Sequence, residues 1–266
     1  MKEKEFALLM AKKAGKIIKK NFAMGMEKEW KSDNTPVTVT DKAVNSLLIK
    51  ESKRYFPKYG ILGEEENSIV GNEEYHWVCD PVDGTIPFSH GIPACVFSLA
   101  LVRNGESILG VVYDPFIDRM FFAEKGKGAF MNGEKISVST SKNLKSSVIG
   151  IAGFNSATFN LTNVETALRK KGVKTINLGS ITYMGMLVSN KELAATIFAG
   201  LKPHDTAALK VIIEEAGGRV TDLFGNEQRY DKDIKGHLCS NGVLHEELLK
   251  IIKENLIDGQ NKPLGH

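Results

Sequence analysis

The stretch Asp80-Pro81-Val82-Asp83-Gly84-Thr85 constrains this chain most, because it follows the apolar run 75–79 and carries two acids three residues apart. The proline has no N–H and fixes a backbone torsion, so the carbonyl of Val82, between the acids, can face inward. Carboxylate and carbonyl oxygens that converge on one point are the ligands that Mg²⁺ prefers. Gly84 allows a close backbone approach to a ligand, and Thr85 offers a hydroxyl. A metal site is one interpretation, and an Asx turn that caps a helix is the other.

The composition fits a soluble enzyme better than a nucleic-acid-binding or secreted protein. The 266 residues suffice for one large domain or two small ones that share a core. A net charge of +3, with lysines spread along the chain, makes nucleic acid an unlikely partner. Three widely spaced cysteines predict buried free thiols in a reducing compartment. The sequence shows no apolar run of membrane-span length and no signal-peptide pattern, so we expect a cytoplasmic protein without membrane contact.

The first half, residues 1–143, predicts an α+β domain in which helices cover an antiparallel sheet. An amphipathic helix is expected over residues 3–22, and a second helix begins with Thr40 or Asp41 as its cap. Asn104-Gly105 is a strong hairpin signal within the sheet. The expected strands are 61–62, 75–79, 96–102, 108–113, 119–123, 129–131 and 136–138.

The second half, residues 144–266, alternates strands and helices and predicts an α/β domain. The expected strands are 148–151, 175–178, 195–198, 220–223 and 237–239, and the expected helices are 164–171, 181–188, 205–216 and 244–256. One helix begins at Gly179-Ser180 and another at Asp205. Gly179 and Ser180 are candidate backbone contacts to a ligand, or a simple helix cap.

Further acids stand where the fold can bring them to the central stretch. Glu64 follows a short expected strand, as Asp80 and Asp83 do, and Asp41 and Asp205 stand at expected helix starts. Taken singly, helix-start acids are usually caps, and the glutamates that follow position 63 are a solvated charge run. Four crowded carboxylates could not all stay ionised without cations. We therefore expect bound metal if these side chains meet, in an active site that the two halves share.

Three motifs stand in register along the chain. They are Leu-Gly-Glu-Glu at 62–65, the stretch 80–85, and His-Asp-Thr-Ala-Ala at 204–208 with Glu-Ala-Gly-Gly at 215–218. In order and spacing these motifs resemble those of the inositol monophosphatase family, the Mg²⁺-dependent, lithium-sensitive phosphomonoesterases. The resemblance extends from the first helix to about residue 256. It implies a layered α/β/α/β/α sandwich of the inositol monophosphatase and fructose bisphosphatase type, usually a homodimer.

The resemblance also implies roles for the matching residues. The metal ligands would be Glu64, Asp80, the Val82 carbonyl, Asp83 and Asp205. The catalytic residues would be Glu64, Asp41 and Thr85. The substrate contacts would be Gly84, Thr85 and Asp205, with Gly179 and Ser180 beside the leaving group. Two to three Mg²⁺ ions would neutralise the phosphate and activate a water that attacks in line, and Thr85, paired with Asp41, would orient that water.

The sequence leaves several substrates open. Inositol monophosphate or a related small sugar or polyol phosphate is the first expectation. Inositol-selective members carry an acid a few positions before the late aspartate, whereas residues 198–202 include none. Lys202 suits the second phosphate of fructose 1,6-bisphosphate or adenosine 3',5'-bisphosphate, or it is solvated. Residues 200–203 are similar to the histidinol-phosphate phosphatase branch.

Two alternatives lie outside this class. The chain would then be a non-catalytic or RNA- or transcription-associated binding protein, or a metal-dependent nuclease that uses the same carboxylates. Phosphate release from small monoesters in the presence of Mg²⁺ separates the three interpretations.

Overall fold

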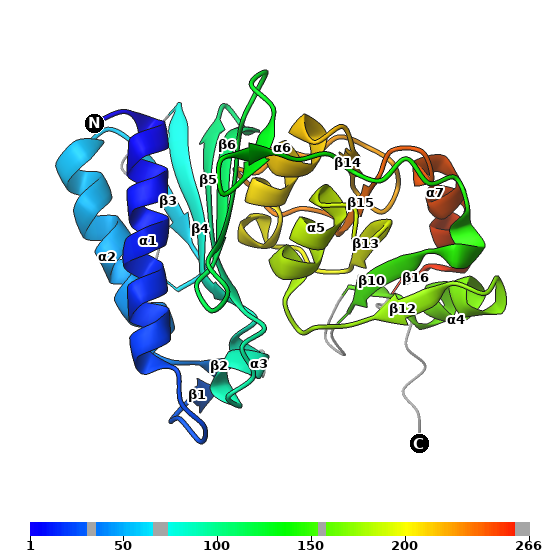
Figure 1. The fold of residues 1–266 in the computed structure, drawn as a ribbon, viewed down its shortest axis with the longest axis horizontal. Helices are drawn as coiled ribbons and strands as arrows, with labels where there is room; N and C mark the ends of the chain where they lie inside the picture. The colour runs from blue at the N-terminus through cyan, green and yellow to red at the C-terminus, as the bar shows by residue number, and fades with distance from the viewer. Residues whose placement is uncertain (31–35, 66–73, 154–157, 259–266) are drawn as a thin grey trace.

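Two large sheets alternate with three layers of helices (Figure 1). The structure is a computed structural model that describes residues 1–30, 36–65, 74–153 and 158–258. In chain order its elements are α1 (Glu3–Asn21), β1 (Glu29–Trp30), β2 (Pro36–Val37), α2 (Val39–Tyr55), β3 (Gly60–Gly63), β4 (Tyr75–Asp83), α3 (Thr85–Ser89), β5 (Val96–Arg103), β6 (Glu106–Asp114), β7 (Arg119–Glu124), β8 (Ala129–Met131), β9 (Glu134–Lys135), η1 (Leu144–Ser146), β10 (Val148–Ala152), β11 (Phe159–Asn160), α4 (Thr162–Lys170), β12 (Lys174–Ile176), α5 (Ile181–Ser189), β13 (Ala195–Phe198), η2 (Pro203–Asp205), α6 (Ala207–Glu215), β14 (Arg219–Thr221), β15 (His237–Ser240), α7 (His245–Asn255) and β16 (Ile257–Asp258).

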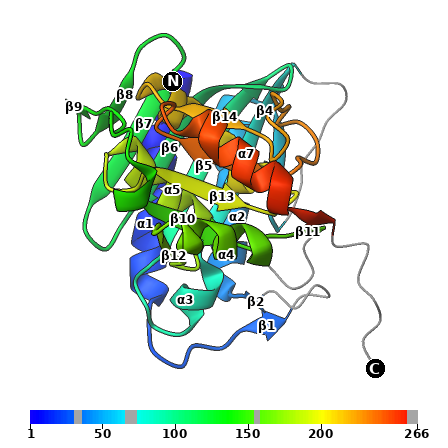
Figure 2. The same ribbon diagram turned by 90° about the vertical axis from the view of Figure 1, so that its right-hand side faces the viewer.

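The predicted α/β/α/β/α sandwich is confirmed. Helices α1 and α2 cover one face of a seven-stranded sheet, and α5 and α6 lie between that sheet and a five-stranded one. Helices α4 and α7 cover the outer face of the second sheet, as Figure 2 shows. Because α6 packs against both sheets, the two halves share their central layer. The division into domains at residues 143 and 144 stays a prediction.

The first helix shows how the sequence builds this layering. Its buried residues include Phe6, Met10, Ala14 and Ile18, which recur every four positions and so form one face of a helix. Gly15 lies on the same side, and a Cβ there would stand 2.3 Å from the ring of Tyr113 on β6. The glycine therefore lets α1 approach the sheet closely.

The first sheet differs from the expectation of a purely antiparallel one. Its order is β3-β4-β5-β6-β7-β8-β9, and β3 runs parallel to β4, while the other pairs are antiparallel. The parallel pair aligns Gly63 with Cys79, so that both strands end at the same edge. The strand expected over residues 136–138 is wrong, since β9 covers only Glu134–Lys135 and the backbone of Val138 bonds to Ala216 instead.

The second sheet has the order β12-β10-β13-β15-β14, with β10 parallel to both its neighbours. The expected strands and helices of this half are present, with ends that differ by a residue or two. One helix start was wrong. Asp205 is the last residue of the 3₁₀ turn η2, and α6 begins at Ala207 after Thr206. None of the helices in the described ranges has the length and apolar character needed to cross a membrane.

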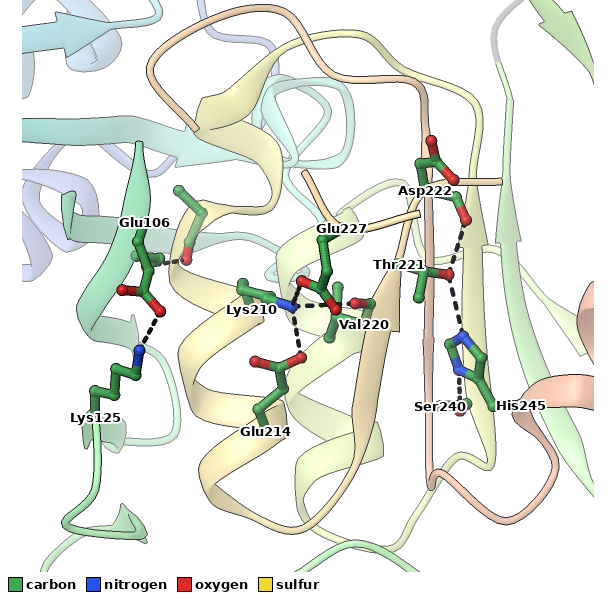
Figure 3. A network of polar contacts seen from close by, with 12 residues as sticks. Glu106, Lys125, Lys210, Glu214, Val220, Thr221, Asp222, Glu227, Ser240 and His245 are labelled. Carbon is green, nitrogen blue, oxygen red and sulfur yellow. Dashed lines mark hydrogen bonds and ion pairs between the residues drawn. The ribbon is translucent and has the colours of Figure 1, made fainter. Parts of the chain in front are cut away.

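A buried lysine joins α6 to the β14 side of the second sheet (Figure 3). The Nζ atom of Lys210 lies 2.6 Å from Glu214 Oε1, 2.5 Å from Glu227 Oε2 and 3.2 Å from the Val220 carbonyl oxygen. Only 11% of the lysine side chain is exposed, so its charge depends on these partners. In contrast, Lys125 pairs with Glu106 in water, with more than half of each side chain exposed.

Replacing Lys210 with methionine is expected to lower the free energy of unfolding by about 2 kcal/mol, because Glu214 loses its partner in a half-buried position. The matched substitution Lys125→Met removes an exposed ion pair and should cost less than about 1 kcal/mol. Urea denaturation of both variants measures the difference. Equal effects of the two substitutions would show that the Lys210 network contributes no more than a surface pair.

Candidate metal centre and substrate cavity

Three acids from both halves of the chain meet at one edge of the first sheet. Asp80 and Asp83 stand at the end of β4, and Asp205 ends the turn η2 before α6. One carboxylate oxygen from each of these residues lies within 4.8 Å of the others. Asp80 is 3% and Asp83 6% exposed, so both carboxylates are largely removed from water. The structure thus brings together the acids that the sequence placed in different halves.

A bulge in β4 aims the two aspartates. The strand was expected to end at Cys79, but it continues through the motif to Asp83, and its pairing with β5 shifts register between Asp80 and Asp83. A bulge re-aims side chains without breaking the strand. Within it, the Val82 N–H donates to Asp80 Oδ1 at 3.0 Å. Pro81 has no N–H to offer the ladder, which suits this position.

The N-terminus of α5 holds Asp83 from the other half of the chain. The Oδ2 atom of Asp83 accepts hydrogen bonds from the Ser180 hydroxyl and, at 2.6 Å, from the Thr182 N–H. The Ile181 N–H donates to the Oδ1 atom of Asp83 at 3.3 Å. The Thr182 hydroxyl also donates to the carbonyl oxygen of Asp205 at 3.2 Å. The first turn of α5 therefore contacts two of the three clustered acids.

Gly84 is required where the two halves approach each other. Its φ of +97° lies in the left-handed region, and a Cβ there would stand 2.6 Å from the Ala94 carbonyl oxygen and 2.9 Å from the Ser180 Cβ. A side chain would push β4 away from α5. Gly84 is also the N-cap of the short helix α3, which begins with Thr85.

Thr85 and Asp41 form a hydrogen-bonded pair beside the clustered acids. The Thr85 hydroxyl stands 3.2 Å from Asp41 Oδ1 and 3.0 Å from the Val82 carbonyl oxygen. Neither Thr40 nor Asp41, the two caps that the sequence predicts, is the N-cap of α2. Thr38 is the N-cap, and Asp41 Oδ2 accepts from the Thr38 N–H at 2.8 Å as the third residue of a capping box. The capping box leaves Oδ1 facing Thr85.

A second group of acids adjoins the first. Oxygens of Asp41, Glu64 and Glu65 lie within 4.8 Å of one another. The Glu64 N–H donates to the Cys79 carbonyl at 3.2 Å, so the parallel pairing of β3 with β4 places the glutamates beside the aspartate motif. The sequence did not single out Glu65 as a site residue. The sequence signal for Glu65 was its place next to Glu64, directly after a short expected strand. The next glutamate of the run, Glu66, lies outside the described residues.

Burial makes the carboxylates of Asp41, Asp80 and Asp83 costly to ionise. Burial, and next the charge of Glu64, raise the pKa of Asp80 well above its usual value. Burial also raises the pKa of Asp83 to about 6, although its hydrogen bonds to α5 oppose the shift, and the pKa of Asp41 to about 6. A divalent cation removes this penalty. The donors are clustered carboxylate oxygens, and those of Asp80 and Asp83 are buried, so the group fits Mg²⁺.

A cavity of about 590 Å³ opens over the acids between α3 and the ends of β10 and β12, elements that face each other in Figure 1. Its lining is Pro36, Glu64, Asp80, Val82, Asp83, Gly84, Thr85, Ile86, Pro87, His90, Ile92, Ala152, Gly153, Asn177, Leu178, Gly179, Ile181, Phe198 and Asp205. Asp41 and Ser180 are fully buried and are not in that lining. The expected backbone contact of Ser180 with a leaving group stays a prediction, and the Ser180 hydroxyl is bonded to Asp83.

Lys202 lies away from this cavity. Its Nζ atom pairs with Asp233 Oδ1 at 3.0 Å, and both side chains are more than half exposed. Of the two interpretations that the sequence left for Lys202, the structure favours the solvated lysine over a second-phosphate contact.

Comparison with known proteins places this geometry in context. Residues 2–256 match the sequence model of the inositol monophosphatase family. The chain is 35% identical over 219 residues to the fructose-1,6-bisphosphatase/inositol-1-monophosphatase of Thermotoga maritima, which covers 82% of each chain. A solved IMPase of Thermotoga maritima is similar in structure, with a TM-score of 0.86, 32% identity and coverage of 96% of this chain and 98% of that one. A crystal structure of an IMPase/NADP phosphatase complexed with Mg²⁺ and phosphate has a TM-score of 0.83, 26% identity and coverage of 95% of each chain.

Proposed function

This chain belongs to the inositol monophosphatase family and is a phosphoric monoester hydrolase, and we propose that its clustered acids bind the Mg²⁺ on which hydrolysis depends. The observation that carries the proposal is the approach of Asp80, Asp83 and Asp205 to within 4.8 Å at the floor of a cavity. Oxygen ligands drawn from both halves of the chain suit a hard divalent cation. Small alcohol phosphates, with inositol monophosphate and related sugar or polyol phosphates as the first candidates, are the proposed substrates.

The proposed ligands of two to three ions are those that the sequence indicated. They are Glu64, Asp80, the Val82 carbonyl, Asp83 and Asp205, to which the structure adds Glu65 as a neighbour of Glu64. Bound Mg²⁺ neutralises the charge of the phosphate dianion and lowers the pKa of water. Gly84 and Thr85 line the cavity, and their backbone N–H groups are proposed to bind phosphate oxygens.

The pair of Thr85 and Asp41 is proposed to handle the proton of the attacking water. The Thr85 oxygen accepts a hydrogen bond from the water and so orients it toward phosphorus. The Thr85 hydroxyl in turn donates to Asp41 Oδ1, which stands 3.2 Å away, and the charge of Asp41 favours removal of the proton. Thr38 holds the other oxygen of Asp41 in place.

The proposal includes three further properties: a cytoplasmic location, a homodimeric state and inhibition by lithium. The three cysteines are free and buried, which supports a reducing, cytoplasmic location. Family membership supports a homodimer and inhibition by lithium. Size-exclusion chromatography with light scattering tests the first of these two, and turnover at rising LiCl, with KCl as the ionic-strength control, tests the second.

Phosphate release tests the central proposal. With saturating Mg²⁺ the purified protein should release phosphate from a panel of inositol 1-phosphate, fructose 1,6-bisphosphate, histidinol phosphate and adenosine 3',5'-bisphosphate, and chelation by EDTA should stop the release. No release from any ester would favour the binding role, and cleavage of oligonucleotides alone would favour the nuclease. The ranking of the panel decides among the phosphatase substrates.

Replacing Thr182 with valine is expected to weaken Mg²⁺ binding about fivefold, because the side chain loses its hydrogen bond to the Asp205 carbonyl while keeping its volume. The Mg²⁺ concentration for half-maximal turnover and the Kd for Mn²⁺ should both rise, and turnover at saturating Mg²⁺ should change less. Thr182→Ser should restore tight binding. The control is Thr166→Val on α4, where an exposed hydroxyl donates to a helix carbonyl in the same way. Equal metal affinity in Thr182→Val and the wild type would contradict this role.

A further inference from the structure

A second cavity lies where the chain enters its second half, apart from the clustered acids. Its volume is about 600 Å³, and it is lined by Lys142, Asn143, Leu144, Lys145, Lys171 and Glu247. We call this cavity the lysine pocket. Three lysines and one glutamate give its lining a formal charge of +2, whereas the whole chain carries +3. The lysine pocket therefore concentrates positive charge that the rest of the chain nearly balances.

The lysine pocket and the cavity over the acids lie at opposite ends of β10 and β12. These neighbouring strands run parallel, so their first residues, Val148 and Lys174, are aligned (Figure 2). Most of the lysine pocket comes from residues just before the two strands, whereas residues 152–153 and 177–179, at and after their ends, line the other cavity. The five residues of β10 span about 15 Å between them. A ligand in the lysine pocket therefore leaves the catalytic cavity open.

The three lysines of this pocket lack carboxylate partners. Elsewhere exposed lysines reach acids, as Lys12 reaches Asp118 at 2.6 Å and Lys202 reaches Asp233 at 3.0 Å. Among the residues that the structure describes, no ion pair forms at any of the three pocket lysines or at Glu247. One exposed lysine needs no explanation, because lysine is usually found at the surface. Three that line one cavity leave several ammonium groups available to a single anion.

The backbone that carries these lysines is held in place by local contacts. The Ser147 hydroxyl donates to the Asn143 carbonyl oxygen at 2.8 Å, and Leu144, which is 6% exposed, packs in the hydrophobic core of the second half. Gly172 has a φ of +85°, and a Cβ there would stand 3.0 Å from the Cγ atom of Lys145, so the glycine leaves room for the lysine stem. A pocket formed before its ligand arrives loses less entropy on binding.

We propose that the lysine pocket is a second binding site, which takes a small oligophosphate such as inorganic tripolyphosphate or the triphosphate of a nucleotide. One exposed ammonium group gains little from one anion, so a single phosphate is held weakly. A chain of linked phosphates meets all three lysines at once, and the volume of the pocket is in the range of small-molecule sites. The lining has no aromatic side chain on which a base could stack, so recognition depends on the phosphates. The site goes beyond the proposed hydrolysis and does not depend on it.

Calorimetric titration with tripolyphosphate at low salt tests the site, on protein freed of metal so that no cation draws the anion to the clustered acids. The triple variant Lys142→Gln/Lys145→Gln/Lys171→Gln should raise the Kd about tenfold or more. Glu247→Gln removes the one acid of the lining and should lower the Kd about threefold. The control is Lys16→Gln/Lys19→Gln/Lys20→Gln, which removes the same charge from the exposed face of α1 and should change the Kd less than about twofold. Orthophosphate should bind about tenfold more weakly than tripolyphosphate.

The outcomes separate a built site from general attraction. No binding of tripolyphosphate, an unchanged Kd in the pocket variant, or an equal loss in the α1 control would overturn the proposal. Orthophosphate that binds as tightly as tripolyphosphate would also overturn it, since linked phosphates would then have no advantage. ATP in the same titration identifies the source: tighter binding than tripolyphosphate indicates a nucleotide, weaker binding indicates an inorganic oligophosphate, and both support the shared chemistry.

Phosphate release keeps this site distinct from the proposed function. Turnover of inositol 1-phosphate with Mg²⁺ should be the same in the pocket variant and the wild type, because the two cavities lie at opposite ends of β10 and β12. A large loss of turnover in the pocket variant would contradict the separation of the two sites. If the wild type hydrolyses no monoester, the proposed function fails, whereas binding of tripolyphosphate still decides this inference.

Discussion

Asp80→Asn is expected to lower turnover by about a thousandfold or more while the protein stays folded. Asp80 is one of the proposed metal ligands, and it lines the cavity with Asp83 and Asp205. Loss of the Asp80 charge weakens the binding of metal, which supplies several kcal/mol of stabilisation to the transition state. A loss of about 4 kcal/mol corresponds to a thousandfold decrease in turnover rate. Phosphate release under saturating Mg²⁺ measures the effect.

The same substitution should stabilise the folded protein when metal is absent, although it lowers turnover. Asparagine is nearly isosteric with aspartate and removes one buried charge from the cluster, so Asp80→Asn should be more stable than the wild type in EDTA. Mg²⁺ should raise the Tm of the wild type more than that of the variant. The control Asp118→Asn changes an exposed carboxylate that pairs with Lys12 and should retain turnover. Substantial turnover in Asp80→Asn would overturn the assignment of Asp80 as a metal ligand.

Acid is expected to destabilise the second half of the chain through two buried histidines. Burial lowers the pKa of His237 to about 3 and that of His245 to about 4. The unfolded chain protonates histidine near pH 6.5, so between pH 6.5 and the folded pKa the unfolded state binds more protons and stability rises with pH. Above pH 6.5 the two neutral histidines cost the folded state nothing, and the free energy of unfolding decreases as the pH falls below that value. At pH 4.5 each histidine should cost about 2.5 kcal/mol.

Variants isolate this effect from the titration of the buried carboxyls, which shifts stability in the opposite direction. The ring of His245 lies between the Ser240 hydroxyl, 2.8 Å from Nδ1, and the Thr221 hydroxyl, 3.0 Å from Nε2 (Figure 3). The loss of unfolding free energy between pH 7 and pH 4.5 should be about 2.5 kcal/mol smaller in His245→Gln than in the wild type. Urea denaturation of the wild type and of His245→Gln at pH 7 and at pH 4.5 gives the four free energies of unfolding. The same pH dependence in variant and wild type would show that His245 is not held neutral.

Much of the fold and the candidate site could be predicted from the sequence because local pattern and local chemistry agree there. The four-residue recurrence of buried positions in α1 and the Asn104-Gly105 hairpin each specify one element. The motif at residues 80–85 carries its acids close together in the chain, so their meeting needs no long-range information. The family resemblance supplied the partners of this motif and the order of layers.

Features that depend on tertiary pairing could not be predicted in this way. The parallel pairing of β3 with β4 places Glu65 beside Glu64 and Asp41, and nothing local in the sequence signals which strands pair. The role of Thr182 depends on the first turn of α5 meeting the turn η2, where the Thr182 hydroxyl bonds to the Asp205 carbonyl. Thr38, two residues before Thr40 and three before Asp41, is the cap of α2 because its hydroxyl and N–H engage Asp41 in a capping box.

The most direct test of the shared metal centre is anomalous scattering from crystals soaked in Mn²⁺, a Mg²⁺ substitute that scatters strongly. Our account predicts a peak that contacts carboxylate oxygens of Asp80, Asp83 and Asp205 together, and its loss in crystals of Asp205→Asn. Mn²⁺ that binds only at residues of one half, or a peak that persists in full without the Asp205 carboxylate, would contradict a site built from both halves of the chain.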